Sequence, residues 1–324
     1  MAATGKFATV FGGSGFVGRQ IVWSLARRDY RVRAAVRRPD LAGYLQPMGV
    51  VGQVHAVQAN LRFVDSVVRA VEGAETVVNS VGILAPSGAQ TFHEVHVEGA
   101  RRIAKAAREA GAKRLVHISA IGANKDSNSR YAVSKAEGEA AVLAEFPSAI
   151  ILRPSIVFGP EDQFFNRFAA LARVSPILPL VGGGRTKFQP VFSGDVGEAV
   201  ANAVTGEGKP GAVYELGGPQ VVTFRDILEA TLRYAGRRKV LLPVPFWMMR
   251  LQALLTWPLP NAVRPITVDQ LRLLKLDNVV SDAAKSEDRT IASLGVPQPA
   301  SIEAIVPQYL ERFNPKGQYA SYRV

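Results

Sequence analysis

A tyrosine and a lysine four residues apart carry the clearest chemical signal in the sequence. Tyr131 and Lys135 fit the pattern Y-x-x-x-K, and residues at this spacing lie on one face of a helix. A nearby cation lowers the pKa of a phenol from its usual value of about 10, which makes the hydroxyl usable as an acid or a base. The spacing therefore predicts a tyrosine that exchanges protons and a lysine that assists it.

A glycine-rich loop near the start of the chain predicts a dinucleotide site. Gly12, Gly15 and Gly18 follow a strand-like run and open a helical one. Glycines allow the tight turn and close backbone approach that a pyrophosphate needs, and the following helix offers it free N–H groups. An ordinary glycine turn is the alternative, but the position at the first strand–helix junction favours nucleotide binding. Lys135 can then approach both Tyr131 and the ribose of a bound nicotinamide.

The end of the second expected strand favours NADPH over NADH. An NAD site is expected to place an acidic residue about 20 residues after the glycine loop, where it holds the ribose 2′-hydroxyl. Here Arg37 and Arg38 occupy that position, and the first acid is Asp40. Guanidinium groups fit a 2′-phosphate through charge-assisted bonds, whereas the alternative is a pair of solvated loop charges. Asn60 and Leu61, after the third strand, stand where an adenine contact is expected.

Short β-branched runs alternate with helix-length stretches through the first half of the chain. This alternation is typical of βαβ units and predicts an α/β fold of the Rossmann type with a doubly wound parallel sheet. The expected strands are Phe7–Phe11, Arg31–Val36, Val54–Ala56, Thr76–Asn79, Arg114–Ser119 and Ile150–Arg153. The expected helices are Val17–Arg28, Val64–Val71, Val95–Ala110 and Ser134–Glu145.

Proline and glycine become frequent after Pro160 and mark a change of organisation. The sequence predicts a dinucleotide-binding domain over residues 1–158, with later strands from about 186–218. Residues 159–185 and 219–324 are expected to form a smaller C-terminal α/β cap of the substrate-domain type, followed by a tail. The expected elements of this half are a strand at Ala212–Leu216, helices at Phe224–Tyr234, Val268–Leu276 and Ile302–Phe313, and an apolar run at Phe246–Leu255.

Composition and charge narrow the function classes. The 324 residues contain no cysteine, which excludes disulfides, thiol nucleophiles and cysteine-held zinc or iron–sulfur clusters. The four histidines lack the spacing of a transition-metal site, so no metal is expected. The formal charge of +12 is concentrated in residues 1–38 and 233–275, each with eight basic residues and one acidic residue. This favours anionic partners such as cofactor phosphates, lipid head groups or an acidic protein face, and no nucleic-acid partner is expected.

An apolar stretch in the basic C-terminal region raises the question of a membrane. Prolines and Arg250 interrupt Leu241–Leu259, so no transmembrane helix is expected. The stretch contains Trp247 and Trp257, and basic residues such as Arg264 surround it. One alternative is a helix buried within the cap. The other is an interfacial element that contacts anionic lipid head groups or a protein partner.

These motifs together resemble the extended and atypical short-chain dehydrogenase/reductase superfamily. Further matches are the runs Arg153–Pro160 and Gln189–Val196. Within the superfamily, Lys113–Ser119 and Ser129–Tyr131 are most similar to the branch that contains nucleotide-binding accessory subunits of respiratory complex I. The resemblance covers nearly the whole chain.

The resemblance implies a tightly held NADPH in a protein that serves assembly or stability at the junction of the two arms of the complex, off the electron path. It implies a peripheral position on the cytoplasmic, or matrix-equivalent, side of an energy-transducing inner membrane. By position, Tyr131 and Lys135 flank the nicotinamide ribose. The residues expected to contact the cofactor are Gly12, Ser14, Gly15, Phe16, Val17, Gly18, Arg37, Arg38, Asn60, Leu61, Ser80, Val81, Gly82, Ser119, Tyr131, Lys135, Pro154 and Ser155.

One departure from the superfamily pattern concerns catalysis. Active extended members place further hydroxyl residues after the fifth strand, whereas Ser119 is followed here by alanine and isoleucine. The run His96–Gly99 replaces the usual asparagine of the fourth helix. The catalytic set of Tyr131, Lys135 and Ser119 is therefore expected to bind cofactor rather than to support turnover. A free NADPH-dependent reductase, dehydratase or epimerase is the alternative, and a redox-sensing regulator is a third hypothesis.

Overall fold

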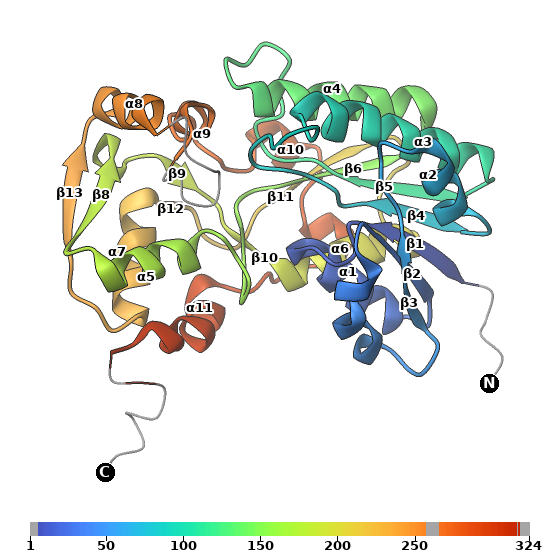
Figure 1. The fold of residues 1–324 in the computed structure, drawn as a ribbon, viewed down its shortest axis with the longest axis horizontal. Helices are drawn as coiled ribbons and strands as arrows, with labels where there is room; N and C mark the ends of the chain where they lie inside the picture. The colour runs from blue at the N-terminus through green and yellow to red at the C-terminus, as the bar shows by residue number, and fades with distance from the viewer. Residues whose placement is uncertain (1–5, 257–265, 316, 318–324) are drawn as a thin grey trace. The chain divides into compact units, whose positions relative to one another are not determined.

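The computed structural model describes residues 6–256, 266–315 and 317, and the chain divides into two compact units (Figure 1). The first unit contains residues 1–154, 193–216 and 280–298. The second contains residues 155–192, 217–279 and 299–324. Each unit has its own core of buried apolar side chains.

A seven-stranded parallel sheet forms the centre of the first unit. Its strands are β1 (Phe7–Phe11), β2 (Arg31–Val36), β3 (Val54–Gln58), β4 (Thr76–Asn79), β5 (Arg114–Ile118), β6 (Ile150–Pro154) and β11 (Val213–Leu216). Their order is β11-β6-β5-β4-β1-β2-β3, and every neighbouring pair is parallel. The winding reverses between β1 and β4, and sheets of this kind bind ligands at the carboxyl ends of the strands at such a point. The predicted doubly wound α/β fold is confirmed.

Helices cover both faces of this sheet. Those on one face are α2 (Val64–Val71), α3 (Gly99–Glu109) and α4 (Arg130–Glu145), and those on the other are α1 (Phe16–Ala26) and α6 (Ser193–Thr205) (Figure 1). Val67, Ile103 and Val142 project from α2, α3 and α4 into one buried cluster with strand residues. Each such side chain contributes about 1.5–3 kcal/mol when it is fully buried.

Helix α1 begins at Phe16, one residue before the expected Val17, and the starts of two other helices differ more from the prediction. The expected helix over Val95–Ala110 consists of a π-helical turn, His93–Glu98, followed by α3. Helix α4 begins at Arg130 instead of Ser134, because the hydroxyl of Ser129 accepts a hydrogen bond from the first turn and caps the helix.

Helices α1 and α6 pack closely against each other. A Cβ atom on Gly197 of α6 would lie 2.8 Å from the carbonyl oxygen of Gln20 of α1, so the close approach requires a glycine. Next to it, Ser24 and Arg28 donate to the carboxylate of Glu198 at 2.8 and 2.7 Å. The pair is therefore fixed by both shape and hydrogen bonds.

Residues 280–298 belong to the first unit, although the sequence places all of 219–324 in the smaller domain. The segment contains α10 (Asp282–Ser286), and Val280 beside it packs against Ile121, which follows β5. The backbone N–H of Ser281 donates to Glu215 of β11 at 2.7 Å. These contacts join residues far apart in sequence, which is why local patterns did not reveal them.

The second unit is built from short strand pairs and helices. Its strands pair as β7 (Val157–Phe158) with β10 (Val191–Phe192), β8 (Ile177–Val181) with β13 (Val240–Val244), and β9 (Lys187–Phe188) with β12 (Val222–Thr223). Strands β9 and β10 thus lie outside the seven-stranded sheet, in which later strands from about 186 were expected. Its helices are α5 (Phe165–Val174), α7 (Phe224–Tyr234), α8 (Phe246–Leu255), α9 (Val268–Leu273) and α11 (Ile302–Leu310). Across the described parts of both units, no helix has the length and apolarity needed to cross a membrane.

Candidate functional site

The glycine loop between β1 and α1 is held in shape by its own backbone. Gly12 has a φ of +76°, and its carbonyl oxygen accepts the N–H of Gly15 at 2.8 Å. A Cβ atom on Gly18 would lie 2.0 Å from the same oxygen, so α1 can begin this close to the loop only with glycine there. In the described part of the chain, no side chain caps the first turn of α1. Its N–H groups are therefore available to a phosphate.

Two side chains that the sequence analysis missed pack on this loop. Tyr44 donates its hydroxyl to the carbonyl oxygen of Ser14 at 2.6 Å. The guanidinium of Arg19 lies 4.9 Å from the centroid of the Tyr44 ring and 3.4 Å from the same carbonyl oxygen. Arg19 directly follows the last glycine of the motif and could have been found from that position, whereas only the fold brings Tyr44 to the loop. Phe16 and Val17, both half-buried, begin α1 beside it.

Arg37 and Arg38 follow β2 and are both exposed, but their surroundings differ. Arg38 donates Nε and Nη2 to the carboxylate of Asp40 at 3.0 and 2.7 Å. These hydrogen bonds hold the pKa of Asp40 below its usual value and raise that of Arg38. Arg37 makes no ion pair with any residue that the structure describes, so its guanidinium is the one available to a phosphate.

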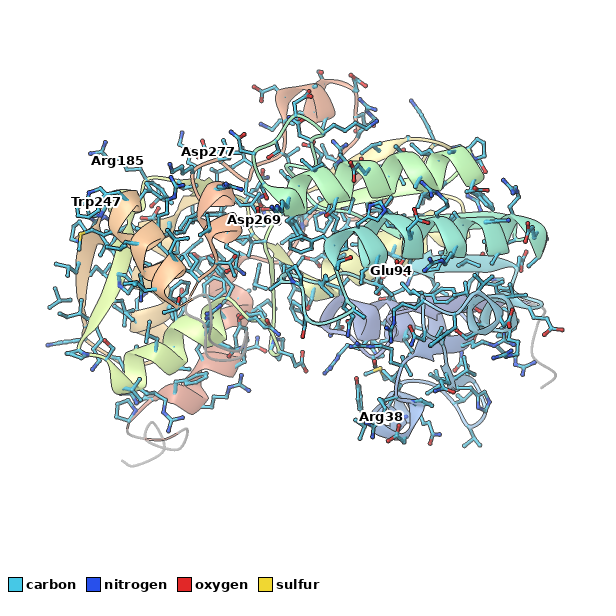
Figure 2. The ribbon with its side chains drawn as sticks, turned by 45° about the horizontal axis from the view of Figure 1, so that its top comes forward. Arg38, Glu94, Arg185, Trp247, Asp269 and Asp277 are labelled. Carbon is cyan, nitrogen blue, oxygen red and sulfur yellow. The ribbon has the colours of Figure 1, made fainter. Side chains whose placement is uncertain are left out.

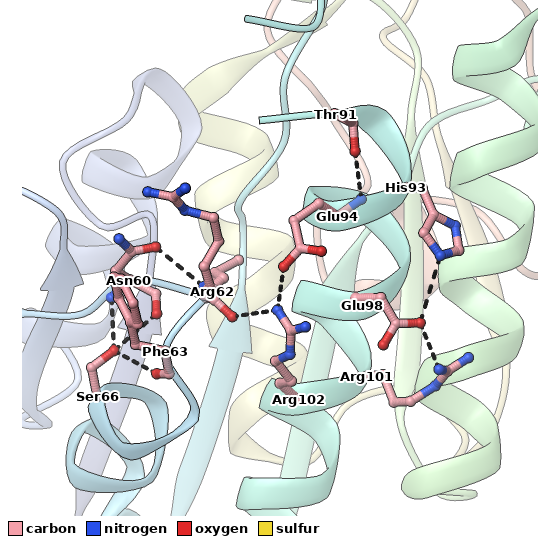
Figure 3. Close-up of polar contacts among 11 residues, drawn as sticks. Asn60, Arg62, Phe63, Ser66, Thr91, His93, Glu94, Glu98, Arg101 and Arg102 are labelled. Carbon is pink, nitrogen blue, oxygen red and sulfur yellow. Dashed lines mark hydrogen bonds and ion pairs between the residues drawn. The ribbon is translucent and has the colours of Figure 1, made fainter. Parts of the chain in front are cut away.

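Asn60 and Leu61 form a turn that α3 helps to fix (Figure 3). The side-chain oxygen of Asn60 accepts the backbone N–H of Arg62 at 3.2 Å, and its backbone binds the hydroxyl of Ser66 at 2.9 and 3.0 Å. The carbonyl oxygen of Leu61 accepts Nη1 of Arg102 at 2.8 Å, and Arg102 also pairs with a glutamate of the π-helical turn. The turn expected to contact adenine is therefore fixed by the protein itself.

The loop after β4 connects the glycine loop with the lysine of α4. A Cβ atom on Gly12 would lie 3.1 Å from Oγ of Ser80. A Cβ atom on Gly82 would lie 3.5 Å from Nζ of Lys135, so the absent side chain leaves room beside the ammonium. Val81 lies between Ser80 and Gly82 in the sequence, so one short segment makes both contacts. The structure thus brings the two strongest sequence motifs to the same edge of the sheet.

A chain of hydrogen bonds fixes the first turn of α4. Nε2 of His96 accepts the backbone N–H of Ile83 at 3.0 Å, so Nδ1 carries the proton and donates to Oγ of Ser134 at 2.9 Å. Oγ of Ser134 donates in turn to the carbonyl oxygen of Tyr131 at 2.8 Å. Burial first, and then the charge of Lys135, lowers the pKa of His96 to about 2 and keeps it neutral. His96, at the position of the usual asparagine, thus holds the backbone of the tyrosine.

Burial governs the ionisation of the Tyr131–Lys135 pair. Lys135 is 5% exposed and donates Nζ to the carbonyl oxygen of Ile118 at 3.1 Å. Burial lowers its pKa to about 8, while the carboxylate of Glu139 acts in the opposite direction. Burial raises the pKa of Tyr131 to about 12. The expectation that the phenol pKa is lowered is therefore wrong, because burial disfavours the charged phenolate.

A second neutral histidine lies close to the lysine. Asn79 of β4 donates Nδ2 to Nδ1 of His117 of β5 at 3.0 Å, in direct register across the two strands. Burial, followed by the charge of Lys135, lowers the pKa of His117 to about 3. Both histidines that interact electrostatically with Lys135 thus add no charge at neutral pH.

Ser119 has a buried hydroxyl without a hydrogen-bond partner in the described structure. The residue follows β5 and is 4% exposed, and its backbone N–H donates to the carbonyl oxygen of Leu152 at 2.7 Å. An unpaired hydroxyl of this kind costs about 1–3 kcal/mol. A polar group of a bound ligand, such as the carboxamide of a nicotinamide, would supply the missing partner.

Pro154 and Ser155 are divided between the units. Pro154 ends β6, whereas Ser155 begins the second unit. Oγ of Ser155 lies 2.7 Å from Oδ1 of Asn278, which also accepts the N–H of Ile156 at 3.1 Å. The hydroxyl of Ser155 is therefore engaged within its own unit. Among the residues described, no three histidine or acidic side chains gather into a group that could hold a metal ion.

Helix α8 carries an exposed apolar surface. It buries Met249 and Ala253, whereas Trp247 is 67% exposed at the edge of the helix (Figure 2). The described residues therefore do not bury the helix on all sides, as one of the two alternatives supposed. Trp257 and Arg264, from the same basic region, lie outside the described residues. The exposed apolar side chains, called the α8 surface below, are Trp247, Met248, Leu251, Leu254 and Leu255.

Known proteins share both the sequence pattern and the fold. NADH dehydrogenase [ubiquinone] 1 alpha subcomplex subunit 9 of Arabidopsis thaliana is 33% identical over 87% of this chain and 73% of its own length. The 40 kDa subunit of NADH-ubiquinone oxidoreductase from Neurospora crassa is 31% identical over 97% of this chain and 81% of its own. The ceramide reductase of Caulobacter vibrioides is 36% identical over 53% of each chain.

The solved structure of the Citrobacter sp. triphenylmethane reductase complexed with NADP(H) has the same fold. It aligns over 93% of this chain and 99% of its own with a TM-score of 0.73, at 20% identity. The NAD dependent epimerase/dehydratase family matches residues 8–217, which include the glycine loop, the tyrosine–lysine pair and the seven-stranded sheet except for Phe7, the first residue of β1. Residues 280–298 of the first unit lie outside the match. This chain belongs to the NAD dependent epimerase/dehydratase family of extended short-chain dehydrogenases/reductases.

Proposed function

We propose that this chain is an NADPH-binding accessory subunit of respiratory complex I, in which the cofactor serves structure and assembly and is off the electron path. The observation that carries the proposal is the similarity, over 87% and 97% of the chain, to two proteins named as subunits of that complex. The site supports it in two further respects, a complete cradle for a dinucleotide and a reduced set of catalytic hydroxyls.

Each part of a nicotinamide dinucleotide has a candidate partner among these residues. The uncapped N–H groups at the start of α1 suit the pyrophosphate, and the fixed turn at Asn60 suits the adenine. Lys135 has a single acceptor among the described residues, the carbonyl of Ile118, which leaves N–H donors for ribose hydroxyls. The unpaired hydroxyl of Ser119 suits the carboxamide. When bound, the nicotinamide would supply hydride chemistry, which an accessory subunit need not use.

Charge at the end of β2 favours NADPH over NADH. The guanidinium of Arg37 is available to a 2′-phosphate. The guanidinium of Arg38 already binds the carboxylate of Asp40, so it would have to bind the phosphate and Asp40 together. Arg19 adds positive charge on the glycine-loop side. The acid of this region, Asp40, is already paired with Arg38 at 2.7 Å, which favours a role in positioning that arginine over a role as the ribose-binding acid of an NAD site.

The reduced hydroxyl set favours binding without turnover. Ser119 is followed by Ala120, so the superfamily's additional hydroxyl is missing. The high pKa of Tyr131 keeps its phenol protonated at neutral pH, which suits a hydrogen bond to a ribose hydroxyl. A cofactor held in this way would stabilise the first unit by binding only its folded form.

We assign the α8 surface to contact with anionic lipid next to the complex. Large exposed apolar patches mark interaction sites, and tryptophan is favoured at the level of lipid head groups. The sequence around it, residues 233–275, carries eight basic residues against one acidic residue, which complements anionic head groups. The protein would then be peripheral, on the inner side of an energy-transducing membrane, where the peripheral and membrane arms of complex I meet.

Purification of the tagged chain from mildly solubilised native membranes tests the accessory-subunit assignment. We expect complex I subunits to copurify, and the extracted nucleotide to be NADPH. A soluble, monomeric chain without complex I subunits would contradict the assignment, whatever nucleotide it carries.

Flotation with vesicles tests the lipid contact. We expect the purified chain to float with vesicles that contain phosphatidylglycerol and to remain behind with pure phosphatidylcholine. Replacing Trp247 and Leu251 by serine should abolish flotation, whereas Leu276→Ser, at another exposed leucine of the second unit, should not. Equal flotation of both variants would remove the α8 surface from the proposal.

A free reductase is the second candidate, and the retained Tyr131–Lys135 pair favours it. The Caulobacter relative is named a ceramide reductase, so an oxidised ceramide is the first substrate to test. A protonated Tyr131 is suited to donate a proton to the carbonyl oxygen of a substrate as hydride arrives at its carbon. This candidate predicts that Tyr131→Phe abolishes NADPH oxidation while the NADPH dissociation constant changes little. If no oxidation is detectable with the unaltered chain across lipid, sugar and quinone substrates, the reductase is contradicted.

A further inference from the structure

Charged side chains of alternating sign form a row that starts at Lys135. Glu139 lies one helical turn further along α4 and is 5% exposed. Its two carboxylate oxygens accept Nε and Nη2 of Arg153 at 2.9 and 2.6 Å. Nη1 of Arg153 lies 4.0 Å from Glu215, directly opposite it in register between β6 and β11. The other oxygen of Glu215 accepts the N–H of Ser281 at 2.7 Å, at the start of α10.

We propose that Glu139 is a positioning residue that holds the charge of the Lys135 ammonium for the bound cofactor, and that Arg153 and Glu215 hold Glu139 in place. The inference rests on the proposed cofactor site and concerns how that site is maintained. Neither Glu139 nor Glu215 belongs to the tyrosine–lysine motif, and neither needs to touch the cofactor for this role.

Glu139 is the carboxylate that acts on Lys135 among the described residues. The other groups around the ammonium are the carbonyl of Ile118, the neutral imidazoles of His96 and His117, and the protonated phenol of Tyr131 on the same helix. None of these carries a negative charge at neutral pH. Burial favours the uncharged amine, and the carboxylate of Glu139, one helical turn away, acts in favour of the ammonium.

Arg153 and Glu215 explain how the carboxylate of Glu139 can be buried. A buried carboxylate is costly unless it is paired and hydrogen-bonded, and Arg153 provides a bidentate pair. Glu215 in turn balances Arg153. If Glu139 were made neutral, Lys135 would lose the attraction of its carboxylate. This loss favours release of the proton from Lys135.

An ordinary structural ion pair makes a different prediction. If Glu139 and Arg153 only join α4 to β6, then removing the pair lowers the free energy of unfolding but leaves the pH dependence of cofactor binding unchanged. The proposed role shifts that pH dependence. The two roles are therefore distinguished by a binding titration across pH rather than by stability.

The experiment measures the NADPH dissociation constant of the full chain by calorimetry from about pH 7 to about pH 10. We expect NADPH affinity to fall as the pH rises through a midpoint near the Lys135 pKa of about 8, because the neutral amine binds the ribose less well. The bound phosphate raises this midpoint. Glu139→Gln should move the midpoint down by about one pH unit. Lys135→Met should remove the midpoint. Glu145→Gln, the same change on the same helix at an ion pair with Arg108, should leave the midpoint in place.

The outcomes separate this inference from the proposed function. If the unaltered chain binds no NADPH, the cofactor assignment itself fails. If it binds with a midpoint that Glu139→Gln does not move in a folded protein, the positioning role is overturned and the pair is structural. If the Glu139→Gln variant does not fold, Glu215→Gln provides the test. This change weakens the anchor of Arg153 and should lower the midpoint by a smaller amount. An unchanged midpoint in Glu215→Gln also overturns the positioning role.

Discussion

At the scale of single residues, burial has more influence than neighbouring charge on the ionisable groups of the site. His96 and His117 are kept neutral and Tyr131 is kept protonated, because each would lose hydration on charging. Lys135 is the group with a compensating carboxylate. Near the tyrosine–lysine pair, the neutral histidines and the protonated phenol therefore keep their protonation states around neutral pH, and Lys135 is the group that can change its charge.

The available guanidinium of Arg37 is expected to decide cofactor preference. Arg37→Ala should weaken NADPH binding about tenfold or more through loss of a charged contact to the 2′-phosphate, and should change NADH binding little. Calorimetric titration with both nucleotides measures this. Arg69→Ala, at an exposed arginine of α2, is the matched control. Equal weakening of NADPH and NADH by Arg37→Ala would argue against phosphate recognition.

The two buried histidines are expected to make the fold sensitive to acid. Their folded-state pKa values of about 2 and about 3 lie below the ordinary 6.5, so below about pH 6.5 the unfolded chain binds protons that the folded chain does not. Each histidine should then cost about 1.4 kcal/mol of unfolding free energy per pH unit. Urea unfolding at pH values from about 7.5 to about 5 measures the slope. His117→Gln should reduce it, and His55→Gln, at an exposed histidine, is the control.

At the scale of elements, the site residues are positioned by where the helices begin and by how closely the helices approach their neighbours. Helix α1 begins against the glycine loop because Gly18 has no Cβ, and α4 begins where Ser129 caps it. The π-helical turn before α3 brings His96 to the backbone of α4, and Gly138 permits this approach, since its Cβ would lie 2.1 Å from the carbonyl oxygen of His96. Small residues at contact points therefore set the positions of the reactive ones.

The α1–α6 contact gives a direct test of this view. Gly197→Ala should destabilise the protein by about 1–3 kcal/mol, because the added methyl group overlaps the carbonyl oxygen of Gln20. Gly43→Ala, where a Cβ would meet nothing within 4 Å, should change stability by less than about 0.5 kcal/mol. Urea unfolding of both variants supplies the comparison. If the two substitutions cost the same, the close packing of α1 on α6 is not what fixes the pair.

At the scale of the whole molecule, the chain builds each unit from separated segments. Residues 280–298 belong to the first unit, although most residues of the second unit precede them in the sequence. Within that segment, Leu294 is fully buried, and its carbonyl oxygen accepts Nδ2 of Asn202 of α6 at 2.8 Å. The first unit therefore depends on the C-terminal part of the sequence for its stability.

This dependence predicts a long-range effect on cofactor binding. Leu294→Asp should cost more than about 3 kcal/mol, because a charge would replace a buried leucine, and the first unit should lose NADPH affinity with it. Leu276→Asp, at a leucine that is 58% exposed, should leave both quantities nearly unchanged. Thermal unfolding with and without NADPH measures both effects. Normal NADPH affinity in a folded Leu294→Asp variant would show that 280–298 is dispensable for the site.

The sequence by itself determined the parallel α/β fold, the family and the main motifs of the site. These depend on short-range patterns: β-branched runs and helical spacing set the elements, and the glycine spacing sets the loop at the first strand–helix junction. Strands β1, β2 and β4 and helices α2 and α7 have the expected bounds for this reason.

Only the tertiary structure decided which distant residues meet. It brought Tyr44 to the glycine loop, Arg153 to Glu139, and residues 280–298 to the first unit. It also reversed the expected shift of the Tyr131 pKa, since burial depends on what packs around a side chain and not on its neighbours in sequence. Contacts across many residues of chain and the hydration of each group are properties of packing, and no local pattern encodes them.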